Sequence, residues 1–257
     1  MSVHGTVLNA VQDCLGAEFM SLYLVGSHGT PQEIAGSDID YILVTKSDLQ
    51  GERLNGLMRV RDELRARLDP EIDFLPRSID RLVTRGLGLK REGRLVGGED
   101  IRDQIKTPPK EERDEWLTSV AMKFVMELHH ADAISSHDLT YPDQADHYFG
   151  YPDYASPKPF ACLMSLGFLA TAWLSKHHDV IVTDKHQIAD LYDVHIGSER
   201  LPFLRDLFTT IRGELGYRLP ASEILRERAR NVCQSALHFE KQMLKRLQVN
   251  SSAAAGR

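Results

Sequence analysis

The chain has 257 residues and a formal net charge of −6 at pH 7, with 42% hydrophobic and 26% charged residues. This length allows one large domain or two smaller ones of about 100–150 residues, each able to bury a core. No apolar run reaches the roughly 18–20 residues of a membrane-spanning helix, and an acidic chain is not expected to coat nucleic acid, because neutralising phosphates requires clustered Lys and Arg.

The cysteines and the start of the chain bear on its location. Cys14, Cys162 and Cys233 are odd in number and far apart, which excludes a disulfide framework and a zinc cluster. The first residues lack a basic segment followed by an apolar one, so we expect no secretion signal. A reducing, cytoplasmic location is the expectation that follows.

The first hundred residues alternate helix and strand patterns, which predicts an α/β (α+β) domain over residues 1–105. In chain order the expected elements are a helix over 7–15, strands over 19–25 and 37–44, a helix over 57–68, and a strand over 71–75. We expect this third strand to end at Pro76, because proline removes a ladder hydrogen bond.

Paired prolines in segment 106–110 mark the domain boundary, because they stop regular structure. Beyond them the apolar spacing is helical, which predicts an all-helical domain over 106–249, followed by a disordered tail over 250–257. The expected helices cover 116–128, 160–174, 188–192, 204–215 and 225–247. An aromatic, proline-containing loop over 141–154 either binds a ligand or packs structurally, and the sequence leaves both open.

Glycine and serine follow the first expected strand. Gly26 lets the backbone approach a ligand closely, and the backbone N–H groups together with the Ser27 hydroxyl suit phosphate oxygens. Ser37 is placed to cap or orient the second expected strand. These residue types after a buried strand predict a phosphate-binding loop.

Two aspartates stand two residues apart in the second expected strand. The side chains of Asp38 and Asp40 therefore share a face, about 6.6–7 Å apart along the strand. Two carboxylates on one face repel each other unless a cation lies between them. Because Mg²⁺ takes one or two protein carboxylates and completes its shell with water and phosphate oxygens, the pair predicts a magnesium site.

A third carboxylate, Asp73, lies between the apolar Ile72 and Phe74 in the third expected strand. Beside a metal site, such a group either ligates a second ion or accepts the proton of an attacking hydroxyl as a general base. Glu71 is the rival candidate for the base.

This set resembles the motif of the polymerase-β-type nucleotidyltransferase superfamily: Gly26-Ser27, then Asp38 twelve residues after the glycine, Asp40, and a later acid at Asp73. The chain is most similar to the streptomycin/spectinomycin-type aminoglycoside adenylyltransferases. The resemblance implies a catalytic domain with a mixed sheet. It also implies Mg²⁺-dependent transfer of a nucleoside monophosphate, AMP from ATP, to a hydroxyl of a small-molecule acceptor, and hence a role in antibiotic resistance.

Segments 94–102, 169–174 and 185–192 extend the resemblance over the whole chain. It implies that Lys185 reaches the triphosphate and that Tyr217 contacts the nucleotide. The family's base is usually Glu, whereas this sequence has an aspartate at the matching position.

The expected partners are ATP and a small-molecule hydroxyl acceptor, without nucleic acid or membrane, for a monomer or homodimer. Two other functions stay open from the sequence. One is a protein-modifying adenylyltransferase of the toxin–antitoxin type, whose acceptor is a Tyr or Ser hydroxyl of a partner. The other is a non-catalytic nucleotide-binding module.

Overall fold

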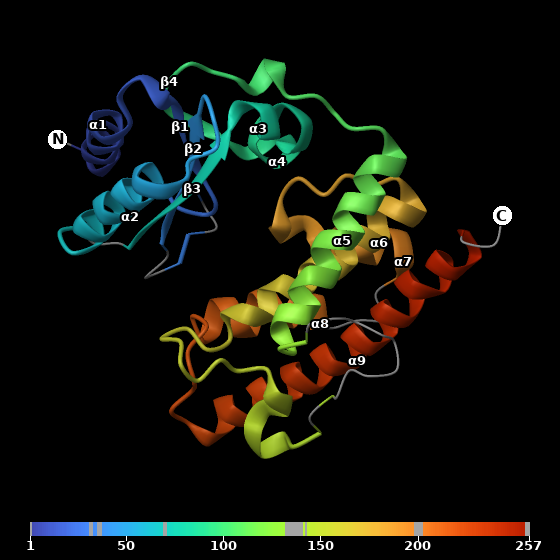
Figure 1. Ribbon diagram of the computed structural model, residues 1–257. Coiled ribbons are helices and arrows are strands. Elements are labelled where there is room, and N and C mark those ends of the chain that lie inside the picture. The colour runs from blue at the N-terminus through green and yellow to red at the C-terminus, as the bar shows by residue number, and fades with distance from the viewer. Residues whose placement is uncertain are drawn as a thin grey trace. The chain divides into compact units, whose positions relative to one another are not determined.

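The structure is a computed structural model that describes residues 2–30, 33–34, 38–68, 71–131, 141, 143–197 and 203–254. The chain divides into two compact units, Met1–Pro108 and Pro109–Arg257. The division falls inside the segment 106–110, where the paired prolines stand. Figure 1 follows the chain through both units.

The first unit is built on a four-stranded sheet of order β3-β2-β1-β4. β2 pairs parallel with β3 and antiparallel with β1, and β1 pairs antiparallel with β4, so the predicted mixed sheet is confirmed. The strands are β1 Phe19–Val25, β2 Ile39–Thr45, β3 Ile72–Ser78 and β4 Arg94–Gly98.

Helices cover both faces of this sheet (Figure 1). Because successive strand residues point to opposite faces, Leu22 and Leu24 of β1 join the core under α1 and α2, whereas Tyr23 joins the core under α3 and α4. The helices of this unit are α1 Val3–Leu15, α2 Gly51–Arg65, α3 Ile79–Arg85 and α4 Leu87–Glu92, with 3-10 turns at Gly16–Glu18 and Arg102–Gln104.

The expected end of the third strand at Pro76 is wrong. β3 continues through Pro76 to Ser78, with Leu43 of β2 opposite the proline. β3 is an edge strand of the described sheet, and an edge strand tolerates proline because the missing N–H can face away from the ladder. The spacing also gave no expectation for β4, α3 or α4, which are short and rich in glycine or charge.

The second unit is largely helical, as predicted. Its helices are α5 Lys110–Leu128, α6 Gly167–His178, α7 Ile188–Ile196, α8 Phe203–Asp206 and α9 Glu223–Ala254, with a π-helical segment Leu207–Glu214 and 3-10 segments Ala145–Gly150, Ala161–Leu166 and Lys185–Gln187. The expected helix 160–174 is thus split into a 3-10 segment and α6, and most of 204–215 is π-helical.

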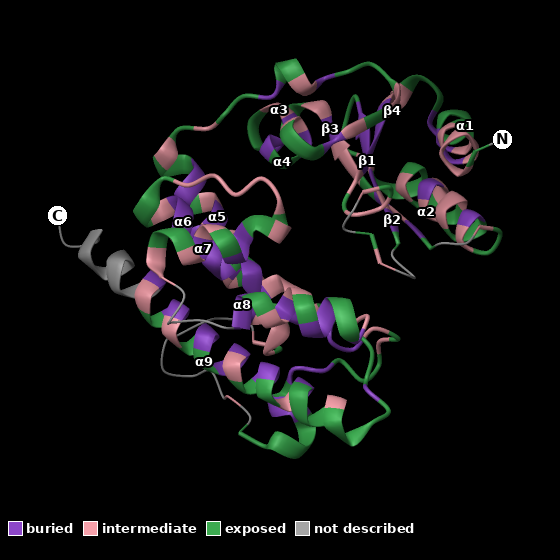
Figure 2. Ribbon diagram, turned by 180° about the vertical axis from the view of Figure 1, so that it is seen from behind, coloured by how far each residue is buried: buried purple, intermediate pink, exposed green. Residues whose placement is uncertain are grey.

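Figure 2 shows α6 buried along most of its length and α9 buried along one side. The backbone of α9 is helical to Ala254, so it extends into the expected tail over 250–257, of which residues 255–257 lie outside the described part. Among the described residues, no helix combines the length and apolar character needed to cross a membrane.

The aromatic loop over 141–154 contributes mainly to the core of the second unit. Tyr148, Phe149 and Tyr151 are buried in that core, whereas the side chain of Tyr154 is exposed. For the three buried rings the structural alternative therefore holds.

Candidate functional site

Two of the predicted carboxylates face each other across the β2–β3 ladder. Asp40 and Asp73 are direct register partners in the parallel pair, so their side chains stand on the same face, on strands about 4.8 Å apart. Both are partly exposed, whereas their neighbours Ile39 and Ile72 are fully buried. The fold thus brings two acids together at the beginning of β2 and β3, within reach of solvent.

Asp38 lies just before this pair. β2 begins at Ile39, so Asp38 is exposed and precedes the strand rather than lying inside it as expected. The backbone N–H of Ile39 donates to the carbonyl of Glu71 at 2.7 Å, which ties the starts of the two strands together. Ser37 lies outside the described residues.

The loop after β1 approaches Asp40 directly. Val25 is the register partner of Asp40, and Gly26 follows with φ +76°. A Cβ built on Gly26 would lie 3.0 Å from Oδ2 of Asp40. Glycine is required here for its backbone conformation and for the space that it leaves to the carboxylate.

The loop itself is held by several hydrogen bonds. The backbone N–H and the hydroxyl of Thr30 both donate to the carbonyl of Ser27, at 3.1 and 2.6 Å. The first residue of β4, Arg94, donates to the carbonyls of His28 and Gly29. A guanidinium group therefore lies beside the loop that the sequence predicts to bind phosphate.

Asp73 is flanked by two arginines of α2. Arg65 Nη2 lies 3.3 Å from Asp73 Oδ1, and Arg61 Nη1 lies 3.8 Å from the same oxygen. The rival acid, Glu71, is exposed and lies before β3, with its Oε1 3.5 Å from Arg65 Nη2. Of the two acids, the one in register with Asp40 is Asp73.

The carboxylates of this site suit a hard cation, although they do not form a complete set of metal ligands by themselves. Within the described ranges, no three His, Cys, Asp or Glu side chains converge on one point. Asp38 and Asp40 suit an ion that takes one or two carboxylates and fills the rest of its shell with water and phosphate oxygens, which is the habit of Mg²⁺. The room left by Gly26 beside Asp40 Oδ2 is consistent with such a ligand.

Lys185 and Tyr217 belong to the second unit. Lys185 is exposed and begins a 3-10 turn, which Asp184 caps by accepting the N–H of His186 at 2.8 Å. Tyr217 has φ +66° and packs, half-buried, against the helical core. Its carbonyl accepts the N–H of Phe160 at 3.0 Å. The roles of both residues toward a nucleotide stay predictions.

Comparisons with known proteins bear on the fold. No family model and no curated protein matches the chain. Among solved structures, spectinomycin adenyltransferase AAD(9) from Enterococcus faecialis, determined with ATP and spectinomycin, matches with a TM-score of 0.57. The match covers 94% of this chain and 99% of that chain at 12% sequence identity.

The fold of this chain is therefore similar to that of a spectinomycin adenyltransferase. The resemblance predicted from Gly26-Ser27 and the Asp38–Asp40 pair is therefore confirmed at the level of the fold. At this identity the match shows the fold and does not establish the substrate or the activity of this chain.

The sequence reasoning missed the arginines of the site. Arg61 and Arg65 are one helical turn apart on α2, which places them on one face of the helix, but nothing in the sequence indicates that this face reaches Asp73. Arg94 stands in a segment that carries the family resemblance, yet its contact with the loop depends on the pairing of β4 with β1.

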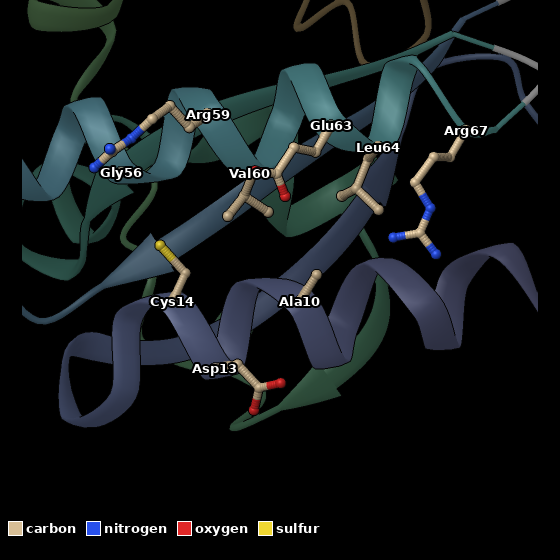
Figure 3. Close-up of a pocket in the computed structure, with 9 residues that line it drawn as sticks. All are labelled: Ala10, Asp13, Cys14, Gly56, Arg59, Val60, Glu63, Leu64 and Arg67. Carbon is tan, nitrogen blue, oxygen red and sulfur yellow. The ribbon is translucent and has the colours of Figure 1, made fainter.

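A pocket of about 530 Å³ lies between α1 and α2, and none of the predicted site residues is among those that line it (Figure 3). Cys14 is exposed and lines this pocket. Partial burial raises the pKa of its thiol, against a smaller opposing effect of Arg59. Because a raised pKa leaves little thiolate at neutral pH, this thiol is not activated as a nucleophile by the described residues.

Proposed function

We propose that this chain is a Mg²⁺-dependent adenylyltransferase that transfers AMP from ATP to a hydroxyl group of a small-molecule acceptor. The observation that carries the proposal is the register pairing of Asp40 with Asp73 beside Gly26, within a nucleotidyltransferase fold. A binding module has no evident need for two acids placed side by side in this way, because neighbouring carboxylates on one face repel each other.

The residues of the first unit divide into two groups by their chemistry. Asp38 and Asp40 hold the cation, and Gly26 and Ser27 present backbone N–H groups and a hydroxyl to the phosphates. When bound, Mg²⁺ neutralises the triphosphate and polarises the phosphoryl group that is attacked.

Asp73 acts as the general base. It accepts the proton of the acceptor hydroxyl, whose oxygen forms a bond to the α-phosphorus. The bond from the α-phosphorus to the oxygen that bridges to the β-phosphorus breaks, and pyrophosphate leaves with the electron pair. Positioning and charge neutralisation supply most of the acceleration, since the reaction needs no covalent intermediate with the protein.

An aminoglycoside-like antibiotic is the acceptor class that we propose. The similar adenyltransferase was determined with spectinomycin, and the net charge of −6 favours the approach of a cationic acceptor. A chain with this activity raises the resistance of its host to such a compound.

The test is incubation of the purified chain with ATP labelled at the α-phosphate, Mg²⁺, and a panel containing spectinomycin and streptomycin. A parallel reaction contains a whole-cell protein extract. We expect labelled antibiotic, and we expect no label with Asp40→Asn.

Two results contradict the proposal. Label that enters protein and not antibiotic favours the protein-modifying alternative. A chain that neither transfers label nor binds ATP with Mg²⁺ is not an adenylyltransferase of this class.

A further inference from the structure

The contacts of Asp73 converge on one of its two carboxylate oxygens. Within the described part of the chain, the N–H of Phe74 donates to Oδ1 at 2.9 Å, and Arg65 and Arg61 approach the same atom at 3.3 and 3.8 Å. Among the described residues, the hydrogen bonds to this carboxylate go to Oδ1 and not to Oδ2. The Asp73 side chain is thus held through Oδ1, and Oδ2 is left to interact with a bound substrate.

Arg65 is itself fixed to β3. Its Nε donates to the carbonyl of Ile72 at 2.6 Å, while its Nη2 reaches Asp73. A guanidinium group is planar and carries its donors in a rigid arrangement, so the bond to Ile72 sets the position from which Nη2 meets the carboxylate. Ile72 and Phe74 pack under α2, so Asp73 points to the opposite face of the sheet. Arg65 of α2 reaches Asp73 because β3 is the edge strand.

We propose that Arg65, assisted by Arg61, is a positioning residue that keeps Asp73 out of the coordination shell of the cation and leaves Oδ2 to accept the substrate proton. This inference rests on the proposed function. It separates three neighbouring acids: Asp38 and Asp40 hold the cation, and the arginines keep the third for proton transfer.

The physical reason is charge. A cationic group beside Oδ1 satisfies that oxygen and opposes the approach of a second cation to it. Asp40 lies opposite Asp73 in the ladder. Without a cationic group beside Asp73, both carboxylates would therefore ligate the same ion. The exposed fractions of the Arg65 and Asp73 side chains are 32% and 50%, and ion pairs this exposed contribute little to folding. A positional role is therefore favoured over a purely structural one.

The test measures cation binding, which needs no acceptor. Mn²⁺ binding to the full chain is followed by electron paramagnetic resonance for wild type, Asp73→Asn, Arg65→Met and the double variant. We expect Asp73→Asn to weaken binding by no more than about five-fold in wild type, as the loss of one nearby charge does. In the Arg65→Met background, where Asp73 is free to become a ligand, we expect a loss of about 20-fold or more.

Two further variants separate position from charge alone. Arg65→Lys keeps the positive charge without the rigid arrangement of donors, so the effect of Asp73→Asn in this background should fall between those in wild type and in Arg65→Met. Arg59→Met removes the same charge from an exposed position of the same helix and should leave the effect of Asp73→Asn unchanged. Far-ultraviolet circular dichroism verifies that each variant is folded.

Equal effects of Asp73→Asn in the wild-type and Arg65→Met backgrounds would overturn the inference, because independent contributions add. So would a loss in wild type as large as that of Asp40→Asn, since Asp73 would then be a ligand already. If wild type shows no Mn²⁺ binding that Asp40→Asn removes, the proposed function fails and the inference falls with it. If that binding is present and the coupling is absent, the inference fails alone.

Discussion

Gly26 lies directly against the carboxylate of Asp40, so that a Cβ on Gly26 would be 3.0 Å from Oδ2. The register partner of Asp40 on β1 is Val25, and the chain turns into the loop immediately afterwards with φ +76°. Gly26, at the end of β1, and Asp40, in β2, are therefore in direct contact at one position. This fit explains why glycine is needed after β1 in physical terms.

Gly26→Ala should weaken ATP-dependent transfer by about tenfold or more, because the new methyl group displaces the Asp40 carboxylate. Some of its effect is general backbone strain, about 1–2 kcal/mol for a side chain in the left-handed region. Gly51→Ala is the control, since Gly51 has φ +53° and no neighbouring atom within 4 Å of the position that a Cβ would take. Urea unfolding should show similar losses for both variants. Equal activity of the two would show that the contact with Asp40 is unimportant.

Asp38→Asn and Asp40→Asn should each reduce transfer by about 100-fold or more, since each removes a carboxylate from the proposed cation site. Both residues are at least partly exposed, so the midpoint of thermal unfolding should change by no more than about 2 °C. Asp80→Asn, at an exposed position of α3, is the control for charge. Wild-type turnover in either site variant would refute the assignment of the metal ligands.

Asp73→Asn and Glu71→Gln distinguish the two candidates for the base. Asp73 is in register with Asp40, whereas Glu71 lies before β3 and is exposed. We expect Asp73→Asn to lower kcat by about 10²–10⁴-fold, the usual contribution of a general base, with the KM for ATP changed little. Glu71→Gln should remain within a few-fold of wild type. The reverse order in steady-state kinetics would move the base to Glu71.

The local parts of the site could be predicted from the sequence because their signals are local. A glycine after an apolar strand and two acids with a spacing of two are visible in a short window. The partner of Asp40 is not, because strand register is a tertiary property. A shift of one residue in the β2–β3 ladder would place Ile72 or Phe74 opposite Asp40 and turn Asp73 to the other face.

The same reason explains the elements that the sequence did not predict. Pro76 ends a strand in a central position but not at an edge, and the sequence alone does not say which strand is the edge. β4 contains Gly97 and Gly98, which remove the alternation that reveals a strand. The approach of Arg65 to Asp73 depends on how the end of α2 meets the edge strand, which no spacing encodes.

The second unit contains a buried acid that no predicted role covers. Glu240 of α9 is fully buried, accepts a hydrogen bond from the hydroxyl of Tyr151 at 2.8 Å, and lies 2.7 Å from Nε2 of His129. Burial, followed by the charge of Glu240, raises the pKa of Tyr151 above its ordinary value. The hydrogen bond between Tyr151 and Glu240 links the aromatic loop segment to α9. Its loss should therefore lower the free energy of unfolding.

Tyr151→Phe should lower the free energy of unfolding by about 1–3 kcal/mol at pH 8, because Glu240 loses a donor while staying buried. Tyr154→Phe, at a site 56% exposed, should change it by no more than about 0.5 kcal/mol.

The unfolded chain releases the tyrosine proton above pH about 10, whereas folded Tyr151 retains it, so wild type loses stability as the pH rises further. Tyr151→Phe lacks this loss, and its deficit relative to wild type should shrink by about 1.4 kcal/mol per pH unit above 10. Urea unfolding at pH 8 and 11 measures both values, and a deficit that stays constant between them would mean that Tyr151 ionises in the folded protein as it does in the unfolded chain.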